Sequence, residues 1–331
     1  MNASTAMEGA LDGKKTPFPL VLWKFARPHT MIGSALAIPA LSILAAPSYQ
    51  AAFSVANMAA AVYAMIPSLL MNIYITGLNQ VTDVEIDKIN KPFLPIASGE
   101  LSMKSAIITC LVTVALSLSL GLASPVLGSS GLNTALWGSC LLGTMYSLPP
   151  FRLKRFPLLA AFCIVAVRGT IINAGFFAHA QSAAFGVSSA TALSCLLGDA
   201  KCGLSSLFFG VFGIVIALMK DVPDVRGDAL SNVRTFSVRI GQKRIFHAMR
   251  KLLMGLFVAY GAGFARGAVM APTALWATFR GMICVASVAA AVSVRKEAQT
   301  VDPEDPAQVY GFYMHLWKLF YLSYLALPFV R

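Results

Sequence analysis

Two short acidic stretches interrupt an otherwise strongly apolar chain, and together they hold six of its fourteen acidic residues. The first, NQVTDVEID, carries an amide and two carboxylates four residues apart: Asn79, Asp83 and Asp87. The second, KDVPDVRGD, carries three carboxylates at spacings of three and four residues: Asp221, Asp224 and Asp228. On an α-helix, either spacing places the three side chains on one face. We therefore expect each trio to point its oxygen atoms at one site, with Pro223 and Gly227 distorting or ending the second helix.

Carboxylates held this close together repel one another, and the repulsion is large where water is scarce. A divalent cation would remove it. Oxygen ligands suit Mg²⁺, which keeps several waters and shares its coordination sphere with substrate phosphates. Two such sites on separate helices would hold a diphosphate between them. The alternative is that these residues are solvated at membrane-helix ends, as we expect for Glu85, which points between the motif positions.

Basic residues near both stretches could neutralise such a diphosphate. Lys91 and Arg152 are the strongest candidates, with an ordinary solvated cation as the alternative for both, and Lys220 adjoins the second stretch. If the diphosphate leaves an allylic carbon, the metal ions and these cations would stabilise the departing charge. Lys154 and Arg155 are interpreted only as determinants of membrane topology.

Four further polar residues are candidates for an acceptor site or a cavity wall. Arg168 lies inside an apolar segment, where a charge is costly and functional by default. It could bind a substrate carboxylate or the diphosphate, or form a structural pair. Asn72 lies seven residues before Asn79, on the same helical face. Arg27 could bind an anion at the start of the first helix or anchor that helix at the interface, and Tyr146 could stabilise a carbocation through its ring or simply pack.

The elements that carry these residues are predicted to be membrane helices. Of 331 residues, 57% are hydrophobic and only 12% charged, whereas soluble domains are nearer a quarter charged. The mean hydropathy is +0.71. A helix crosses a bilayer with roughly 20 apolar residues, and about nine such segments can be drawn: 30–47, 53–78, 104–123, 131–148, 157–180, 203–219, 245–264, 267–293 and 307–329. We therefore predict an all-α polytopic membrane protein, which excludes a soluble prenyl synthase.

The net charge of +12 is distributed unevenly along the chain, which argues against a nucleic-acid partner. With nine spans, twenty basic residues fall in the N-terminal tail and in alternate loops, and only Lys201 and Arg266 fall in the opposite loops. This is the positive-inside pattern, and it places both acidic stretches on the cytosol-equivalent face of the bilayer. The aromatic residues of 310–329 are expected to face lipid or the interface.

Residues 1–21 are predicted to form a polar N-terminal tail, and residues 22–331 a single transmembrane domain. The tail lacks the apolar core of a secretory signal and is too acidic for a convincing transit peptide, so the chain is inserted directly or the start of a precursor is missing. The six cysteines are expected to act as small apolar residues. Only Cys195 and Cys202 share a loop, where a disulfide could form. The sequence carries no prediction of an oligomer.

The acidic stretches resemble the motifs of a known family. NQVTDVEIDKINKP resembles the NxxxDxxxD motif of the UbiA superfamily of intramembrane aromatic prenyltransferases, and KDVPDVRGD is similar to its DxxDxxxD motif. Supporting stretches run from LWKFARPHT at 22–30 to YMHLWKLFYLSYLALPF at 313–329, nearly the whole chain. They look most like the homogentisate prenyltransferases of the tocopherol and plastoquinone pathways. RTFSVRIGQKR and WKLFY look more like the phytyl-transferring branch.

The resemblance implies a UbiA-like bundle of about nine transmembrane helices around a central cavity. It implies Mg²⁺-dependent transfer of a phytyl group from phytyl diphosphate to homogentisate, with loss of CO₂, giving 2-methyl-6-phytylbenzoquinol. The first trio would hold one Mg²⁺ and the second trio the other. The implied location is a plastid membrane in a photosynthetic eukaryote, or the inner membranes of a cyanobacterium.

Two alternatives remain open from the residues. One is the same chemistry with another acceptor, such as a chlorophyllide, a hydroxybenzoate or a naphthoate, or with a solanesyl donor. The other is a transporter whose acidic pairs bind coupling cations. Transporter sites usually lie near the bilayer midplane in broken helices, whereas these motifs are predicted at helix ends.

Overall fold

The structure, a computed structural model, describes residues 16–330. Within them every regular element is helical. Nine long helical segments match the nine predicted ones: α3 (Pro28–Ala45), α5 (Val55–Thr82), α7 (Met103–Ala123), α8 (Ser130–Ser147), the run α9 to η3 (157–184), α12 (Ala200–Lys220), α15 (Gln242–Val269), α16 (Ala274–Gln299) and α17 (Pro306–Ala326). The all-α prediction is confirmed.

Seven of these segments are long and apolar enough to cross a membrane. The helices α8 and α17 fall outside that set, so the count of nine spanning helices stays a prediction. The run 157–184 joins α9 (Pro157–Val165) and α10 (Ile172–His179) through wider π-helical turns, η2 (Ala166–Ile171) and η3 (Ala180–Ala184).

Short helices fill the connections: α2 (Phe18–Phe25), α4 (Tyr49–Ala52), α6 (Val84–Asn90), η1 (Leu153–Arg155), α11 (Ala192–Gly198), α13 (Val225–Leu230), α14 (Phe236–Ile240) and η4 (Leu327–Phe329). The predicted tail therefore ends inside α2, and its residues 1–15 lie outside the described range. Several helices begin where a serine caps them: Ser54, Ser102 and Ser129 each accept a hydrogen bond from a backbone N–H three residues on.

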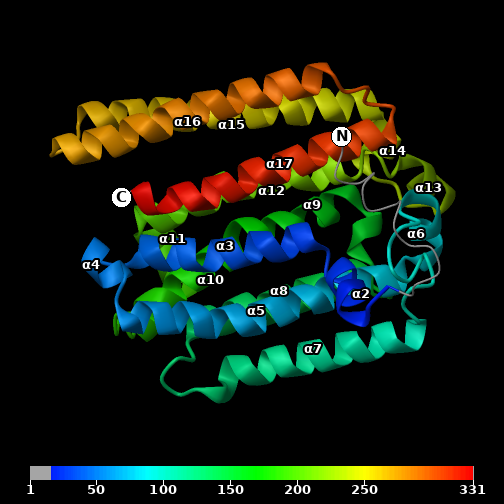
Figure 1. Cartoon of the computed structure of the whole chain (residues 1–331), viewed down its shortest axis with the longest axis horizontal. Helices are drawn as coiled ribbons and strands as arrows, with labels where there is room; N and C mark the ends of the chain where they lie inside the picture. The colour runs from blue at the N-terminus through cyan, green and yellow to red at the C-terminus, as the bar shows by residue number, and fades with distance from the viewer. Residues whose placement is uncertain (1–15, 331) are drawn as a thin grey trace.

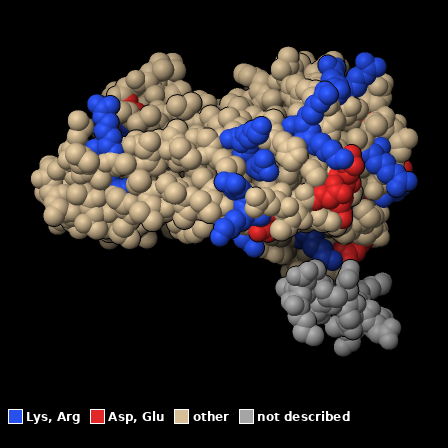
Figure 2. Space-filling model, turned by 90° about the horizontal axis from the view of Figure 1, so that it is seen from above, with Lys and Arg blue, Asp and Glu red and all other residues tan. Residues whose placement is uncertain are grey.

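The long helices lie side by side, and α2, α6, α13 and α14 gather at one end of the bundle (Figure 1). Lysine, arginine and acidic side chains concentrate toward that same end (Figure 2). The alternation of charged and uncharged loops that the sequence predicts is thus seen in the fold. Which compartment the charged end faces stays a prediction.

The helix α12 lies at the centre of the bundle, whereas the α15–α16 hairpin lies at its edge (Figure 1). In the most apolar window of each helix, 67% of the residues of α12 are buried, against 17% in α15 and in α16. A low fraction of residues buried within the protein, as in α15 and α16, is expected of helices that face lipid. Cys195 and Cys202 are both free thiols, so the disulfide considered for them is absent.

The aromatic residues of α17 correct a prediction. Phe312, Trp317, Phe320 and Tyr324 are among the largest fully buried side chains of the chain, not lipid-facing residues. Two of them pack against Phe209 of α12, which stacks on Tyr324 with ring centroids 3.8 Å apart. The helix is flanked by other helices, so composition alone misplaced its aromatic face.

Candidate active site

The first acidic trio spans a break between two helices. The helix α5 ends at Thr82 and α6 begins at Val84, because the backbone of Asp83 leaves helical geometry (φ −117°, ψ 17°). The expected single helical face across 79–87 is therefore wrong in detail. The turn is still tight, since the N–H of Asp87 donates to the carbonyl of Asp83 at 2.7 Å.

The second trio spans a break as well, as Pro223 predicts. Asp221 caps the end of α12, and Asp224 and Asp228 belong to the start and middle of α13. Gly227 lies inside α13 and does not end it.

Both trios line one polar pocket at the charged end of the bundle. All six predicted metal ligands contribute to its wall, together with four basic residues: Arg27, Lys91, Lys154 and Lys220. Two segments about 140 residues apart in sequence therefore meet, as two halves of one site would.

Basic side chains pair with three of the five carboxylates. Asp83 receives Arg152 at 3.2 Å and Lys154 at 2.5 Å. Lys220 pairs with Asp221 at 2.9 Å, and Lys91 pairs with Asp224. Lys91 and Lys220 line the pocket, whereas Arg152 pairs with Asp83 and does not line it. Their binding of a diphosphate stays a prediction.

Lys154 corrects a second prediction. Its side chain is 7% exposed and bonded to Asp83, so it is a site residue and not only a determinant of topology. Burial lowers the pKa of its ammonium, and the neighbouring Asp83 opposes that shift. The short turn η1 points Lys154 inward and leaves Arg155 exposed. Glu85 is solvated as expected, with its side chain 82% exposed.

Asp87 and Asp228 have no basic partner within ion-pair distance among residues 16–330. Burial raises the pKa of Asp87 to about 6 and that of Asp228 to about 8. The Oδ2 atom of Asp87 is buried without a hydrogen-bond partner in the described chain, and so is the Nε–H of Arg27. An acceptor that lacks a cation and a donor that lacks an anion fit a site for a metal ion and a diphosphate.

No three acidic, histidine or cysteine side chains of the described range form a ready-made metal cage. Mg²⁺ does not need one, because it uses one or two carboxylates and completes its sphere with waters and substrate phosphate oxygens. The residues present therefore fit this ion. Neither histidine nor cysteine lines the polar pocket, so the atoms that it can offer as ligands to a metal ion are oxygen atoms.

A larger cavity adjoins the polar pocket, and four residues line both: Arg27, Asn79, Tyr146 and Lys220. The empty space within it is about 1290 Å³, open solvent at the mouth included. Its wall is mostly apolar, with residues such as Met71, Leu142 and Phe176.

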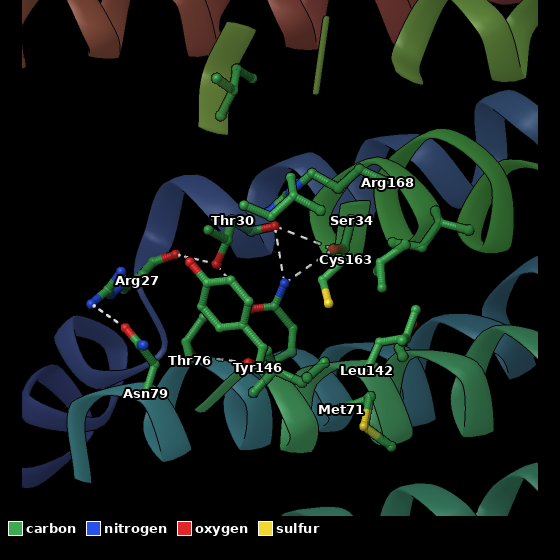
Figure 3. Close-up of a pocket in the computed structure, with 18 of the residues that line it drawn as sticks. Arg27, Thr30, Ser34, Met71, Thr76, Asn79, Leu142, Tyr146, Cys163 and Arg168 are labelled. Atoms are coloured by element: carbon green, nitrogen blue, oxygen red, sulfur yellow. Dashed lines mark hydrogen bonds between the residues drawn. The ribbon is translucent and has the colours of Figure 1, made fainter. Parts of the chain in front are cut away.

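Arg168 and Tyr146 lie on different walls of this cavity (Figure 3). Arg168 comes from the π-helical turn η2, and its guanidinium lies over the ring of Trp317, 4.9 Å from the centroid. No carboxylate in the described chain pairs with Arg168, so the acidic structural pair considered for it is not found.

The two remaining candidates tie helices together at the cavity wall. The amide of Asn72 accepts a hydrogen bond from the hydroxyl of Thr30 at 2.9 Å and donates to Ser34 at 3.2 Å, so it joins α5 to α3. Arg27 donates to the Oδ1 of Asn79 at 3.3 Å, and Figure 3 shows this bond. Both residues line the cavity, and a role in binding the acceptor stays a prediction for them.

Asn90 is a residue of the polar pocket that sequence reasoning missed. Asn90, the last residue of α6, lines the pocket and hydrogen-bonds to the second motif. A signal was available, because Asn90 lies three residues after Asp87 and so faces the same side of the helix.

Comparisons with known proteins agree with this geometry. The model of the UbiA prenyltransferase family matches residues 36–319. Homogentisate phytyltransferase 1 of Arabidopsis thaliana is 39% identical over 93% of this chain and 75% of its own length. A homogentisate geranylgeranyltransferase of Hordeum vulgare is also 39% identical, over 93% of this chain and 72% of its own. The homogentisate phytyltransferase of Synechocystis is 34% identical over 92% and 94%.

Solved structures show the same fold. A UbiA homologue from Archaeoglobus fulgidus bound to DMAPP and Mg²⁺ has a TM-score of 0.60 at 16% identity, covering 94% of this chain and 99% of that one. The same homologue bound to GPP and Mg²⁺ has a TM-score of 0.61 at 15% identity, covering 93% and 99%.

Proposed function

The chain belongs to the UbiA prenyltransferase family, and we propose that it transfers a phytyl group from phytyl diphosphate to homogentisate with loss of CO₂. The product would be 2-methyl-6-phytylbenzoquinol, a step of tocopherol synthesis. One observation carries the proposal: two acidic motifs and four basic residues converge on a polar pocket that shares its wall with a large apolar cavity. A diphosphate suits the first space and a prenyl chain the second.

The polar pocket would hold the donor's diphosphate. Mg²⁺, bound by oxygen atoms of the two trios, would neutralise the diphosphate and stabilise it as a leaving group. The side chains of Lys91, Lys154 and Lys220 are within the same pocket, and Arg27 offers an Nε–H without an acceptor. These donors add to the stabilisation of the charge that develops as the allylic C–O bond breaks.

The acceptor would lie in the adjoining cavity, with its carboxylate on Arg168. Arg168 lines that cavity and has no acidic partner in the described chain. A carboxylate bound beside it would offset the cost of its buried charge. The wall that carries Tyr146 would then hold the ring near the allylic carbon. A ring face stabilises positive charge nearby.

The atoms of the reaction balance without a protein nucleophile. The C–O bond of the donor breaks and its electron pair leaves with diphosphate. A ring carbon of homogentisate forms the new C–C bond, and the electron pair of the C–H bond at that carbon then restores the aromatic ring. The carboxyl leaves as CO₂, and the electron pair of its broken C–C bond takes up the released proton. The hydrogen from the attacked carbon ends on the side-chain carbon, which becomes the methyl group. The protein orients the reactants and excludes water.

The similarity to a homogentisate geranylgeranyltransferase of Hordeum vulgare favours geranylgeranyl diphosphate as the second donor to test. The transporter alternative finds no support, because both motifs lie at helix ends beside the charged loops. We propose a plastid membrane or a cyanobacterial inner membrane as the location, because the relatives are described as chloroplastic or come from Synechocystis.

The deciding assay uses purified protein in detergent with Mg²⁺, homogentisate and phytyl, geranylgeranyl or solanesyl diphosphate in separate reactions. CO₂ release and the lipid product are followed together. A phytylated quinol with matching CO₂ supports the proposal, and EDTA should stop the reaction until Mg²⁺ is restored. A solanesylated product would move the protein to plastoquinone synthesis. If no donor gives a product, the proposal that homogentisate is the acceptor is contradicted.

A further inference from the structure

The side chain of Asn90 connects the two acidic motifs directly. It projects from the end of α6, which carries Asp87, to α13, which carries Asp228. Its Nδ2 donates to the carbonyl of Asp224 at 2.9 Å and to the Oδ1 of Asp228 at 3.4 Å. Its Oδ1 accepts from the N–H of Gly227 at 2.8 Å. Both the donor and the acceptor side of one amide are therefore used on a single partner helix.

The partner helix is shaped to receive this amide. A methyl group added at Gly227 would lie 2.6 Å from the Cγ and 2.7 Å from the Nδ2 of Asn90, and closer still to its Oδ1. Gly227 lies in ordinary helical backbone without a positive φ, so its conformation does not require glycine. The close approach of Asn90 is what excludes a side chain there.

An amide is the group that this geometry calls for. A carboxylate at position 90 could accept from Gly227 but could not donate to Asp224 or Asp228, and it would repel the second of these. An apolar side chain would leave the N–H of Gly227 without its acceptor. The next residue, Lys91, pairs with Asp224, so two consecutive residues hold α6 against α13.

We propose that Asn90 is a positioning residue that fixes the separation of the two halves of the metal–diphosphate site, with Gly227 as its matching surface. The inference rests on the proposed function, because that function requires both motifs to act on one diphosphate. Groups that orient metal ligands in this way typically change metal affinity or activity by about 10–100-fold when they are removed.

The test uses the full-length protein in detergent and Mg²⁺ with inorganic pyrophosphate as the probe, followed by titration calorimetry and by thermal stabilisation. We expect Asn90→Ala to weaken pyrophosphate binding by about 10–100-fold and to raise the Mg²⁺ concentration needed for half-maximal prenyl transfer. Saturating Mg²⁺ should recover most of kcat. If Asn90 had a purely structural role, Asn90→Ala would lower Tm. It would change neither pyrophosphate binding nor the Mg²⁺ concentration needed for half-maximal prenyl transfer.

Asn57→Ala is the matched control, because Asn57 is a buried amide that donates to the carbonyl of Ala52 at 2.8 Å, at the start of α5 and far from α6. It should lower Tm and leave pyrophosphate binding unchanged. Equal weakening by Asn57→Ala would overturn the proposal, since the effect would then be general destabilisation.

A double-mutant cycle tests the fit between the two residues. Gly227→Ala alone should weaken pyrophosphate binding, because the new methyl displaces the Asn90 amide. In the Asn90→Ala background the same change has room, so the double variant should bind no worse than Asn90→Ala. If the two losses multiply instead, or if Asn90→Ala binds as the wild type does, the inference fails. If the variants show the expected losses of pyrophosphate binding but the wild type forms no prenylated product, only the proposed acceptor or donor is contradicted.

Discussion

Asp83 pairs with Arg152 and Lys154, whereas Asp87 has no basic partner within ion-pair distance in the described chain. The same contrast separates Asp221, which pairs with Lys220, from Asp228. Each half of the pocket thus combines a carboxylate whose charge is balanced by the protein with one whose charge is not. An added cation would therefore be stabilised most strongly beside the carboxyl groups that have no basic partner.

Removing one carboxylate from either half should abolish most of the turnover. We expect Asp83→Ala and Asp224→Ala each to lower kcat by about 100-fold or more, because each change removes a proposed metal ligand and leaves a lysine without its partner. Steady-state assays with phytyl diphosphate measure this. Membrane insertion should be retained, and near-normal activity in both variants would contradict the metal assignment. Glu85→Ala, a solvated neighbour, is the control and should act as the wild type does.

Arg168 is predicted to act on the acceptor and not on the donor. Arg168→Ala should cost about 2–5 kcal/mol of acceptor binding, which is the loss for one partner of a buried charge pair. That corresponds to a rise of at least about 30-fold in the KM for homogentisate, with the KM for the prenyl diphosphate unchanged. A rise in the donor KM alone would show that Arg168 binds the diphosphate instead.

At the scale of helices, hydropathy located every long helical segment, and the two acidic motifs supplied residues that line the candidate site. The positions of Asp83, Asp224 and Arg27 in one pocket depended only on which loops meet at one end of a bundle. Alternating charged loops gave that information. The sequence could therefore supply the site's main parts before any coordinates.

The features that could not be predicted from the sequence depend on the direction in which individual side chains point. Lys154 and Arg155 are adjacent cations, yet the turn η1 buries one and exposes the other. The aromatic face of α17 is buried because neighbouring helices cover it, and hydropathy does not distinguish burial in protein from burial in lipid. The break between α5 and α6 at Asp83 could not be predicted, because no proline or glycine lies at that position.

Close approach between helices makes a separate prediction. A methyl group at Gly169 of η2 would lie 2.5 Å from the Cα of Gly210 in α12, and small residues let membrane helices approach in this way. Gly169→Ala should therefore destabilise the protein by about 1–3 kcal/mol, the usual cost of overpacking. It should also disturb Arg168, the adjacent residue of the same turn.

The matched control for this prediction is Gly263→Ala in α15, where an added methyl meets nothing within 4 Å. It should be neutral or slightly stabilising, since alanine favours the helix by up to about 1 kcal/mol. Thermal unfolding in one detergent compares the two variants. Equal Tm values would show that the two helices can separate without cost.

At the scale of the molecule, the separation of charged and uncharged ends predicts its orientation. Positive-inside placement puts α13 on the cytosol-equivalent side and the loop before α11 on the other. In a variant without the six native cysteines, Ser189→Cys should react with a membrane-impermeant maleimide in intact spheroplasts. Leu230→Cys should react only after lysis. The opposite pattern would reverse the topology, and labelling of both from outside would show that the two ends are not separated by the bilayer.

The two reactants of the proposed reaction reach the apolar cavity from different phases. Homogentisate is counted per volume of water, whereas a prenyl diphosphate resides among lipids and is counted per area of bilayer. The effective supply of donor is then its mole fraction in the membrane. Diluting a fixed amount of donor with inert lipid would slow an unsaturated enzyme, while diluting it with water would not. A plastid or cell could therefore regulate this step by changing how much membrane its donor is spread through, with no change in the protein.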